Sequence, residues 1–552
     1  MPVRAELLVR DSLIAVTEAS MGIAMKVLVT DNLSPRGEAV LRAAPEVEVD
    51  VAPTRPPEEL ARVIGAYDAI IIRSATKVTP VVLAQPGRLK VVGRAGVGVD
   101  NVDVEAATAR GIVVMNTPSG NTITVAEHTM GLLLALSKNI PQATASMKAG
   151  RWEKSKYLSV EVCHKVLGVM GLGRIGAEVA RRARAFGMHV IAYDPFLSAE
   201  AAAALGADLV ELSEVFRRAD FITIHVPLSP ETTGLIGAQA IAQMKDGVRI
   251  VNAARGGIVD EAALYDALKS GKVAGAALDV FEREPNTDSP LLSLSSFICT
   301  PHLGAASEEA QENVAVEVAQ QVLDYLLRGI IRNAVNAPSL PAELFRRIEP
   351  YLKLAERLGR LAAQLAEGRT QQIRIHYGGE IAGVDSAPLT VAVVVGVLEA
   401  VLHSADTVNA VNVMGLARGR GIHITESKSA EEADFASIIN VTVGTDRAES
   451  TVAGSLFNRR EPRLVRIDEF RLEAPAEGYM LVFSNMDVPG VIGRIGTVLG
   501  RNQVNIAGMH LGRERQGGRA VSIVNVDSEI PGPVLDEIRR MPDIVYAKLV
   551  RA

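Results

Sequence analysis

Cysteine is scarce in this chain of 552 residues, which also has no basic surplus and no long apolar run. Its two cysteines, Cys163 and Cys299, are too few for a disulfide scaffold and argue against a cysteine-based metal cluster. We therefore expect no metal and a reducing, cytoplasmic setting. Acidic residues outnumber basic ones by 64 to 58, giving a formal net charge of −6. Because nucleic-acid-binding domains usually carry a basic surplus, we expect no nucleic-acid partner.

The apolar segments are too short to cross a membrane. The most apolar runs, around Leu132–Leu136 and Val391–Leu398, fall well below the roughly 20 residues that a spanning helix needs. Residues 1–24 carry acidic side chains within their apolar stretch, which a signal or transit peptide does not. We interpret residues 1–24 as a disordered tail or an alternative start, and we expect no membrane partner.

From Met25 onward, short apolar runs alternate with longer amphipathic stretches, a pattern typical of β-α-β units and parallel sheets. A stretch of helical character at 124–149 interrupts this pattern, which resumes from 166 to 303. We therefore predict an α/β fold with two doubly wound, Rossmann-like parallel sheets joined by one long helix. At about 150 residues per domain, the length allows three to four domains.

The pattern changes in the C-terminal part of the chain. Residues 338–476 predict an α+β intervening domain, in which His423, Lys428 and Arg463 are candidate anion contacts. Residues 477–552 contain a strand, a helix, two strands, a helix and a strand, which is the order of a ferredoxin-like module. We therefore expect two smaller domains after the parallel sheets.

A glycine-rich turn predicts a dinucleotide site. Gly171, Gly173 and Gly176 form a GxGxxG sequence directly after an apolar strand and at the start of a helix. Such glycines allow a tight turn and close backbone approach, and the helix N-terminus receives the pyrophosphate. Asp194 ends the next strand, 23 residues after Gly171, where a carboxylate accepts hydrogen bonds from the ribose hydroxyls and repels a 2′-phosphate. The cofactor is therefore predicted to be NAD rather than NADP.

Charged side chains follow several strands of the second predicted sheet. Arg255 follows RIVNAA, Glu284 lies in FEREP after the next strand, and His302 follows FICTP. Ligands bind outside the carboxyl ends of parallel strands, so these groups are expected to meet in one crevice. Oxidation of a secondary alcohol needs a base for the hydroxyl proton, a cation for the neighbouring carboxylate and a group that orients the base. We predict these roles for His302, Arg255 and Glu284, respectively.

Two further residues at strand ends suit supporting roles. His225 follows DFITI, and we expect it to shape the adenine pocket. Asp279 follows VAGAAL, and we expect it to steady the cofactor or Arg255.

Several segments together resemble the D-isomer-specific 2-hydroxyacid dehydrogenases, and among them the enzymes that oxidise 3-phosphoglycerate. The segments are GRAGVGVDNVD, NTPSGNTITVAEHTMGLLLAL, VMGLGRIG, VNAARGGIVDE, AALDVFEREP and TPHLGAASEEAQ. The resemblance runs from Met25 to the C-terminus. It implies NAD-dependent oxidation of D-3-phosphoglycerate to 3-phosphohydroxypyruvate, the first step of phosphorylated L-serine biosynthesis.

The resemblance also implies a domain plan and site residues. A substrate-binding domain takes residues 25–123 and 307–337, and the NAD-binding domain, residues 124–306, is inserted into it. Arg255, Glu284 and His302 fall on the catalytic residues of the family, at intervals of 29 and 47 residues from the arginine. The cofactor contacts it implies, together with those predicted above, are Gly171, Gly173, Arg174, Ile175, Gly176, Asp194, His225, Pro227, Ala253, Asp279 and Gly304.

A second group of strand-end residues favours a phosphorylated substrate. Arg73 and Ser74 end one strand of the first predicted sheet, and Arg94 with Gly96 ends the next. Since Arg255 already serves the carboxylate, two more arginines and a hydroxyl suit a phosphate, which carries a double charge and several acceptor oxygens. The resemblance assigns these positions, with Asn121, to 3-phosphoglycerate.

The C-terminal module resembles an ACT domain, a small-molecule sensor that usually works as a pair. Its NMDVPGV segment places backbone N–H groups at a helix start, where a carboxylate binds. By resemblance, Asn485, Asp487 and Asn505 contact L-serine, which inhibits the enzyme. An ACT domain that serves assembly alone is the alternative.

Two other functions remain open from the residues. A sister enzyme would act on another 2-hydroxy acid, such as glycerate or 2-hydroxyglutarate, and Arg73 and Arg94 argue against it. A transcriptional corepressor that senses NAD would not need Arg255, Glu284 and His302 together. The helical stretch at 124–149 and the ACT module both favour a homo-oligomer, and the resemblance implies a tetramer.

Overall fold

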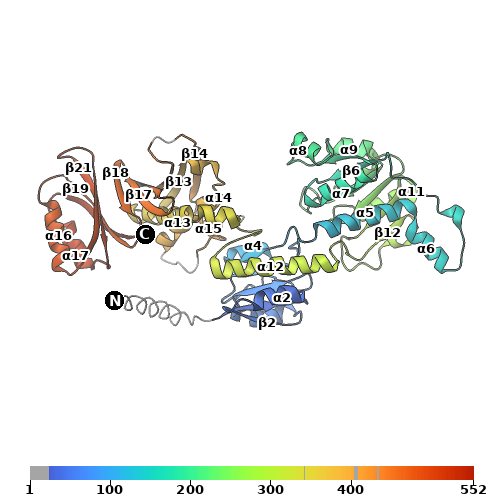
Figure 1. Ribbon diagram of the computed structural model, residues 1–552, viewed down its shortest axis with the longest axis horizontal. Coiled ribbons are helices and arrows are strands. Elements are labelled where there is room, and N and C mark those ends of the chain that lie inside the picture. The colour runs from blue at the N-terminus through green and yellow to red at the C-terminus, as the bar shows by residue number, and fades with distance from the viewer. Residues whose placement is uncertain (1–23, 341, 403–407, 432–433) are drawn as a thin grey trace, which may run out of the picture.

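The computed structural model describes residues 24–340, 342–402, 408–431 and 434–552. These residues form four lobes, each built on one sheet, that are spread along an elongated molecule (Figure 1). The prediction for residues 1–24 lies almost wholly outside the described residues. No helix in the described part of the chain combines the length and the hydropathy that crossing a membrane demands.

The first lobe is a five-stranded, all-parallel sheet between two helical layers. Helices α2 and α12 cover one face of it, and α3 and α4 cover the other. Most of its strands are buried on both faces, which explains their continuous apolar sequences. In spatial order its strands, followed by its helices, are β2 (Val47–Val51), β1 (Met25–Val29), β3 (Ala69–Ile72), β4 (Val91–Arg94), β5 (Val113–Met115), α2 (Pro35–Arg42), α3 (Pro57–Val63), α4 (Val104–Ala109) and α12 (Glu308–Arg328).

The second lobe is a seven-stranded parallel sheet whose strand order reverses between β6 and β9. Helices α5, α7 and α8 pack on one face, and α9, α10 and α11 pack on the other. Its elements are β12 (Phe297–Cys299), β11 (Val273–Leu278), β10 (Val248–Asn252), β9 (Phe221–Ile224), β6 (Val166–Met170), β7 (His189–Tyr193), β8 (Asp208–Leu209), α5 (Thr122–Lys138), α6 (Ile140–Lys148), α7 (Arg174–Ala185), α8 (Ala199–Ala204), α9 (Leu212–Arg218), α10 (Ala238–Gln243) and α11 (Glu261–Ser270). The prediction of two doubly wound parallel sheets is confirmed.

The single long helix predicted over 124–149 is wrong, because the chain breaks between α5 and α6. Asn139 ends α5 in the left-handed conformation, with φ 54°. Asparagine tolerates this conformation better than most residues, and Pro141 at the start of α6 cannot continue the hydrogen bonds of α5. The helical pattern alone did not indicate this break.

The third lobe is a six-stranded mixed sheet with α13 and α14 packed on one face. These two helices meet at glycines: a Cβ at Gly359 or Gly396 would overlap a backbone oxygen of the opposite helix. The elements are β14 (His423–Ser429), β13 (Thr370–Gly379), β15 (Ser437–Thr445), β16 (Glu449–Phe457), β17 (Glu461–Ile467), β18 (Phe470–Pro475), α13 (Ala342–Leu365), α14 (Ala387–Leu402) and α15 (Val413–Gly419).

The fourth lobe has the predicted ferredoxin-like order, with α16 and α17 on one face of an antiparallel sheet. The other face is also buried: Met480, Val482 and Ile523 belong to the core that α13 forms in the third lobe. The third and fourth lobes therefore share one hydrophobic core. The elements are β20 (Ile506–Arg513), β21 (Arg519–Val526), β19 (Tyr479–Met486), β22 (Ile544–Arg551), α16 (Val491–Arg501) and α17 (Gly532–Arg539).

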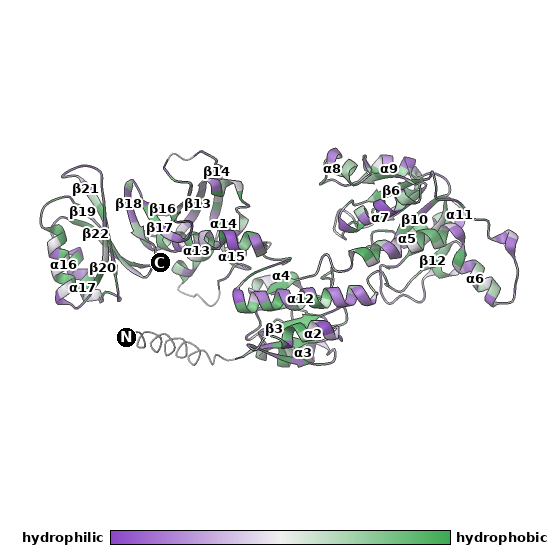
Figure 2. Ribbon diagram, viewed as in Figure 1, coloured by the Kyte–Doolittle hydropathy of each residue, from purple (hydrophilic) through white to green (hydrophobic). Residues whose placement is uncertain are grey.

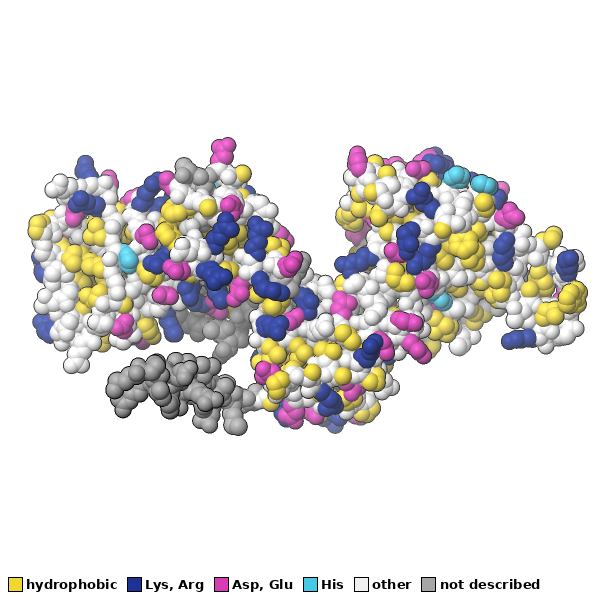
Figure 3. Space-filling model, viewed as in Figure 1, with side chains coloured by type: hydrophobic (Ala, Val, Ile, Leu, Met, Phe, Trp, Pro, Cys, Tyr) yellow, Lys and Arg dark blue, Asp and Glu magenta, His cyan; other side chains and the backbone are white. Residues whose placement is uncertain are grey.

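Helix α12 follows the last strand of the second lobe in the sequence but packs in the first lobe. Its apolar stripe, visible in Figure 2, packs against α2 and β4 of the first lobe. The third lobe reaches the same sheet through Val411, which is buried in the first-lobe core, and through Asn409, whose Nδ2 donates to the Gly111 carbonyl at 2.9 Å. Figure 3 shows the second lobe standing apart from the third.

Replacement of Gly37 by alanine is expected to destabilise the first lobe by about 1–3 kcal/mol. A Cβ at Gly37 on α2 would lie 2.7 Å from the Ala315 carbonyl oxygen of α12, so the two helices would have to separate. The matched control is Gly131→Ala on α5, where a Cβ meets nothing within 4 Å. Urea unfolding checks this, and an equal midpoint for the two variants would contradict the packing.

Candidate active site

The glycine-rich turn lies between β6 and α7, at the carboxyl edge of the second sheet. Gly171 has φ +88°, and a Cβ at Gly176 would overlap the Gly171 carbonyl, so both positions require glycine. A Cβ at Gly173 would meet nothing within 4 Å, so this backbone faces open space. Arg174 and Ile175 begin α7 directly after the turn. The turn thus presents bare backbone and a helix N-terminus to a ligand.

Asp194 follows β7 and lies against this turn. Its Oδ2 accepts from the Leu172 N–H at 2.9 Å, and its Oδ1 accepts from the Phe196 N–H at 2.9 Å. These two bonds fix the carboxylate at the turn. Each carboxylate oxygen still has acceptor capacity, as binding of two ribose hydroxyls requires.

His225 and Pro227 follow β9 beside the same turn, and buried Ala253 follows β10. His225 Nε2 lies 2.9 Å from Thr223 Oγ1, whereas its buried Nδ1 has no hydrogen-bond partner among the described residues. Burial lowers the pKa of His225 to about 4, so the ring is neutral at working pH.

The His302 and Glu284 side chains meet beyond the carboxyl ends of β11 and β12. His302 Nδ1 lies 2.8 Å from Glu284 Oε2, and Glu284 Oε1 accepts from the Phe281 N–H at 3.1 Å. Both side chains are substantially exposed, at 50% and 37%. The pair is therefore open to a ligand, with the Glu284 carboxylate orienting the imidazole.

Asp279 contacts the loop that carries His302, and not Arg255 as one of our alternatives held. Its Oδ1 accepts from Thr300 Oγ1 at 2.6 Å and from the Leu303 N–H at 2.7 Å. Its Oδ2 accepts from the Gly304 N–H at 2.8 Å. Burial alone would raise the pKa of Asp279, but these hydrogen bonds and one from His128 lower it. Asp279 is thus an ionised clamp beneath the loop.

Arg255 follows β10 and reaches across to the first lobe. Its Nε lies 3.2 Å from Asp100 Oδ2, and its Nη1 donates to the Ala254 carbonyl at 2.7 Å. Buried Asn252 fixes the backbone there, since its Nδ2 donates to the Arg255 carbonyl at 2.8 Å. A Cβ at Gly98 would overlap the guanidinium, so Gly98 makes room for it.

Arg94, at the end of β4, shares the cleft with Arg255. Burial, Arg255 and Arg73 together lower the pKa of Arg94 to about 10, although the Asp100 and Asp31 carboxylates act in the opposite direction. A Cβ at Gly96 would overlap the Arg94 guanidinium. Three arginines from two lobes therefore lie within electrostatic range of one another.

Arg73 lies on a loop that Asp31 holds. Asp31 Oδ2 accepts from the Arg73 N–H at 2.9 Å and from the Thr76 N–H at 2.8 Å. Although burial opposes ionisation, hydrogen bonds from Thr54, Thr76 and Arg73 lower the pKa of Asp31. Ser74 is exposed on this loop.

Asn121 precedes α5 near the junction of the two lobes. It is buried, and within the described chain its Oδ1 finds no hydrogen-bond partner. A buried acceptor of this kind is costly unless a ligand or water satisfies it.

The three predicted serine contacts do not meet within one chain. Asn485 pairs with Ala520 at one end of the fourth sheet, and Asp487 accepts there from Arg513 Nη1 at 3.0 Å. Asn505 donates to Asp527 Oδ2 at 2.6 Å at the opposite end of the sheet. Strand register therefore places the three residues at two opposite ends of the sheet.

The candidate anion contacts of the third lobe are also dispersed. His423 and Lys428 lie on the edge strand β14, whereas Arg463 lies on β17, with β13, β15 and β16 between them. Arg463 pairs with Glu461 at 3.2 Å. These three residues do not form one site.

Three residues of the site were missed by the sequence reasoning. Asp31 and Asp100 each follow a strand of the first sheet, so the strand-end rule that found Arg73 and Arg94 could have found them. His128 lies inside α5, and nothing in its helical neighbourhood indicates contact with the distant Thr300.

Comparisons with known proteins cover almost the whole chain. Family models match the NAD binding domain of D-isomer specific 2-hydroxyacid dehydrogenases over residues 130–304, the D-3-phosphoglycerate dehydrogenase intervening domain over 347–468 and the ACT domain over 479–543. A D-3-phosphoglycerate dehydrogenase of Methanocaldococcus jannaschii is 43% identical over 521 residues, covering 94% of this chain and 98% of that protein. One of Bacillus subtilis is 42% identical over 525 residues, covering 95% and 99%.

A solved dehydrogenase structure is similar to more than half of this chain. D-lactate dehydrogenase from Aquifex aeolicus, complexed with NAD and lactic acid, is 30% identical with a TM-score of 0.50. The alignment covers 57% of this chain and 100% of that chain.

Replacement of His225 by glutamine is expected to reduce the fall in the free energy of unfolding as the pH is lowered. The ordinary histidine pKa is 6.5 and that of folded His225 is about 4, so between these values the unfolded chain holds the extra proton. Stability of the wild type therefore falls as the pH falls from about 6.5 to 4, by up to about 3 kcal/mol from this residue.

Urea unfolding at pH 7, 5.5 and 4.5 checks this prediction. The loss on acidification should be smaller for His225→Gln than for the wild type or for the exposed control His189→Gln. Parallel profiles for all three proteins would contradict it.

Proposed function

This chain belongs to the D-3-phosphoglycerate dehydrogenases, and we propose that its cleft oxidises D-3-phosphoglycerate to 3-phosphohydroxypyruvate with NAD, at the first step of phosphorylated L-serine biosynthesis. The observation that carries the substrate assignment is the convergence of Arg73, Arg94 and Arg255 on one cleft. Three cations held near one another repel unless an anion lies between them. A substrate with a carboxylate at one end and a phosphate at the other supplies that charge.

The residues of the second lobe fit NAD. The open backbone at Gly173 and the start of α7 suit the pyrophosphate, and the Asp194 carboxylate suits the adenosine ribose. The unpartnered Nδ1 of His225 suits the adenine side of this pocket. When bound, NAD supplies the acceptor for the hydride that leaves C2 of the substrate.

His302 is the general base in this proposal. Its Nδ1 is engaged by Glu284 at 2.8 Å, which leaves Nε2 to take the proton of the C2 hydroxyl. Glu284 orients the ring and stabilises the imidazolium that forms. On reduction of the ketone, the same Nε2 returns the proton.

The arginines orient the substrate around this base. Arg255 offers the carboxylate the part of its guanidinium that Asp100 and the Ala254 carbonyl do not occupy. Arg73 and Arg94, with Ser74, the Gly96 backbone and Asn121, bind the phosphate and the chain that leads to it. This arrangement presents C2 to the nicotinamide and its hydroxyl to His302.

The lobes divide these tasks. Residues 25–123 and 307–337 bind substrate, residues 124–306 bind NAD, and residues 338–476 and 477–552 form the intervening regulatory domain and the ACT domain. The shared core of the third and fourth lobes supports a role as one regulatory unit.

We also propose that the enzyme is a cytoplasmic homotetramer. The two cysteines are free and exposed, as a reducing compartment permits. Trp152 is 81% exposed, and Leu158 and Met147, which lie near it in the sequence, are exposed by 86% and 54%. Three large, exposed apolar side chains within one short segment suit an interface between subunits.

Two copies of the ACT domain would bring the serine contacts together. If two copies pair along edge strand β20 about a twofold axis, their β20 strands run antiparallel. Opposite ends of the two sheets then lie side by side, and Asn505 of one copy comes near Asn485 and Asp487 of the second. The helix start at Gly490 offers N–H groups for the serine carboxylate. Serine is thus proposed as a feedback inhibitor bound between subunits.

Loss of either phosphate arginine should change substrate preference. For Arg73→Ala and Arg94→Ala we expect kcat/KM for 3-phosphoglycerate to fall by about 10²-fold or more, because a charge-assisted pair to phosphate is lost. For D-glycerate, which lacks the phosphate, the fall should stay within about fivefold. NADH formation measures both, with Arg42→Ala on the exposed end of α2 as the control. Equal losses on the two substrates would contradict the phosphate assignment.

Serine inhibition should depend on both ends of the ACT sheet. Asp487→Ala and Asn505→Ala are each expected to raise the serine concentration for half-inhibition at least tenfold while kcat stays unchanged. The control is Asn502→Ala, because the Asn502 side chain follows α16 and donates only locally, to the Val498 carbonyl of that helix. Mass photometry of the same samples reports the oligomer. Full serine inhibition in either variant would contradict the paired site.

A further inference from the structure

The loop from Thr300 to Gly304 holds His302 in an unfavourable backbone conformation. His302 has φ +55°, in the left-handed region that is unfavourable for a non-glycine residue. Its N–H donates to the carbonyls of Asp279 at 2.9 Å and Thr300 at 3.0 Å. Such a conformation persists only where the surroundings impose it, so the position of His302 depends on what holds this loop.

The Asp279 carboxylate is the centre of that support. It accepts from Thr300 Oγ1 and from the backbone N–H groups of Leu303 and Gly304, on both sides of His302. Asp279 is fully buried, so its orientation depends on the groups that contact it.

His128 of α5 supplies the remaining contact to this cluster. Its Nε2 lies 3.0 Å from Thr300 Oγ1 and 3.3 Å from Asp279 Oδ1. The Thr300 hydroxyl gives its single proton to Asp279 at 2.6 Å, so it can only accept from His128. Nε2 of His128 therefore carries a hydrogen, for which Thr300 Oγ1 at 3.0 Å is a nearer acceptor than Asp279 Oδ1 at 3.3 Å.

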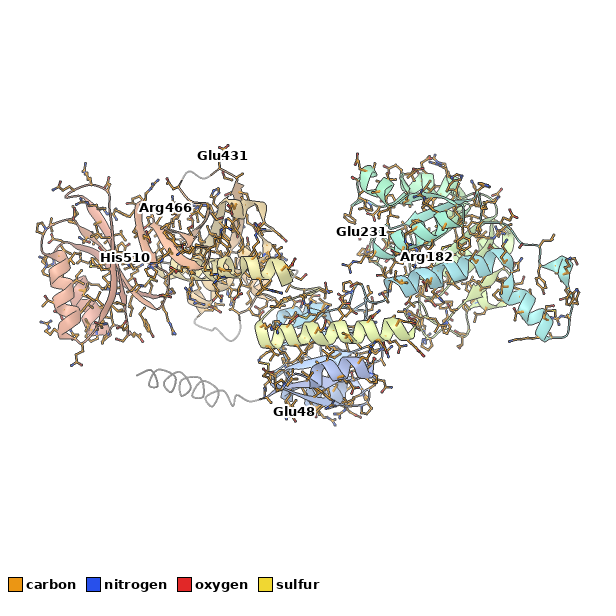
Figure 4. The ribbon with its side chains drawn as sticks, in the orientation of Figure 1. Glu48, Arg182, Glu231, Glu431, Arg466 and His510 are labelled. Carbon is orange, nitrogen blue, oxygen red and sulfur yellow. The ribbon has the colours of Figure 1, made fainter. Side chains whose placement is uncertain are left out.

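Helix α5 is a firm anchor for such a bond. It has 17 residues and packs along α7, where Arg182, labelled in Figure 4, bonds Glu178 of its own helix and lies 3.5 Å from Glu127 of α5. The bond from His128 thus ties the catalytic loop to the helix that packs beside the cofactor-binding helix.

The surroundings of His128 indicate that its ring is not there to fill space. It lines a cavity of about 500 Å³ between α5, α6 and the end of β12, and its side chain is 20% exposed. An apolar residue of similar size would pack equally well at such a partly open position. An apolar residue could not, however, donate the hydrogen bond to Thr300.

We infer that His128 is a positioning residue of the dehydrogenase reaction: by donating to Thr300 it fixes the Asp279 clamp and, through it, the place of His302. This inference rests on the proposed function, because it concerns the step in which His302 takes the substrate proton. Loss of the donor should leave substrate and NAD binding intact and slow the chemical step.

Steady-state kinetics of His128→Leu and His128→Gln test the inference. We expect kcat for His128→Leu to fall about tenfold, the effect of one buried hydrogen bond, with KM for 3-phosphoglycerate and NAD within threefold of wild type. The glutamine amide can donate to Thr300, so His128→Gln should recover at least half of the lost activity on a logarithmic scale. The control is His189→Leu, at an exposed position at the start of β7.

A double-mutant cycle with Thr300→Val shows whether His128 acts through Thr300. If it does, His128→Leu/Thr300→Val should be no slower than Thr300→Val alone. Multiplicative losses, wild-type kcat in His128→Leu, or equal losses in the leucine and glutamine variants would each overturn the inference. Thermal unfolding of every variant separates slow chemistry from misfolding, and the glutamine variant keeps the test decisive if the leucine variant unfolds. Inactivity of the wild type on 3-phosphoglycerate would instead overturn the proposed function.

Discussion

Repulsion among three arginines is the constraint on which the cleft depends. Arg255 comes from the second lobe, and Arg73 and Arg94 come from the first. Burial, together with the charges of Arg255 and Arg73, lowers the pKa of Arg94 to about 10. Asp100 and Asp31 offset part of this repulsion, and Gly96 and Gly98 make room for the guanidinium groups. A bound anion would offset the rest.

The sequence predicted those parts of the site that follow from local chain geometry. The glycine turn, Asp194 and the residues at strand ends were found because a parallel sheet brings its carboxyl ends to one edge. Residues that act over long separations were not predicted. His128 meets Thr300 across 172 residues, and no periodicity within α5 indicates this contact.

Other differences have equally specific physical causes. The long helix was predicted from composition, whereas a left-handed Asn139 breaks it. The serine contacts were assigned from motifs, but pairing of β20 with β21 puts Asn505 far from Asn485. Strand register is set by tertiary structure, so sequence motifs alone do not predict it.

In this enzyme, separate arginines are proposed to bind the carboxylate and the phosphate of a phosphorylated 2-hydroxy acid. A crystal structure of the enzyme with NAD and 3-phosphoglycerate tests this proposal most directly. We expect the carboxylate on Arg255, the phosphate on Arg73 and Arg94, and the C2 hydroxyl within hydrogen-bond reach of His302 Nε2. A phosphate bound by Arg255, or one that leaves Arg73 and Arg94 untouched, would contradict it.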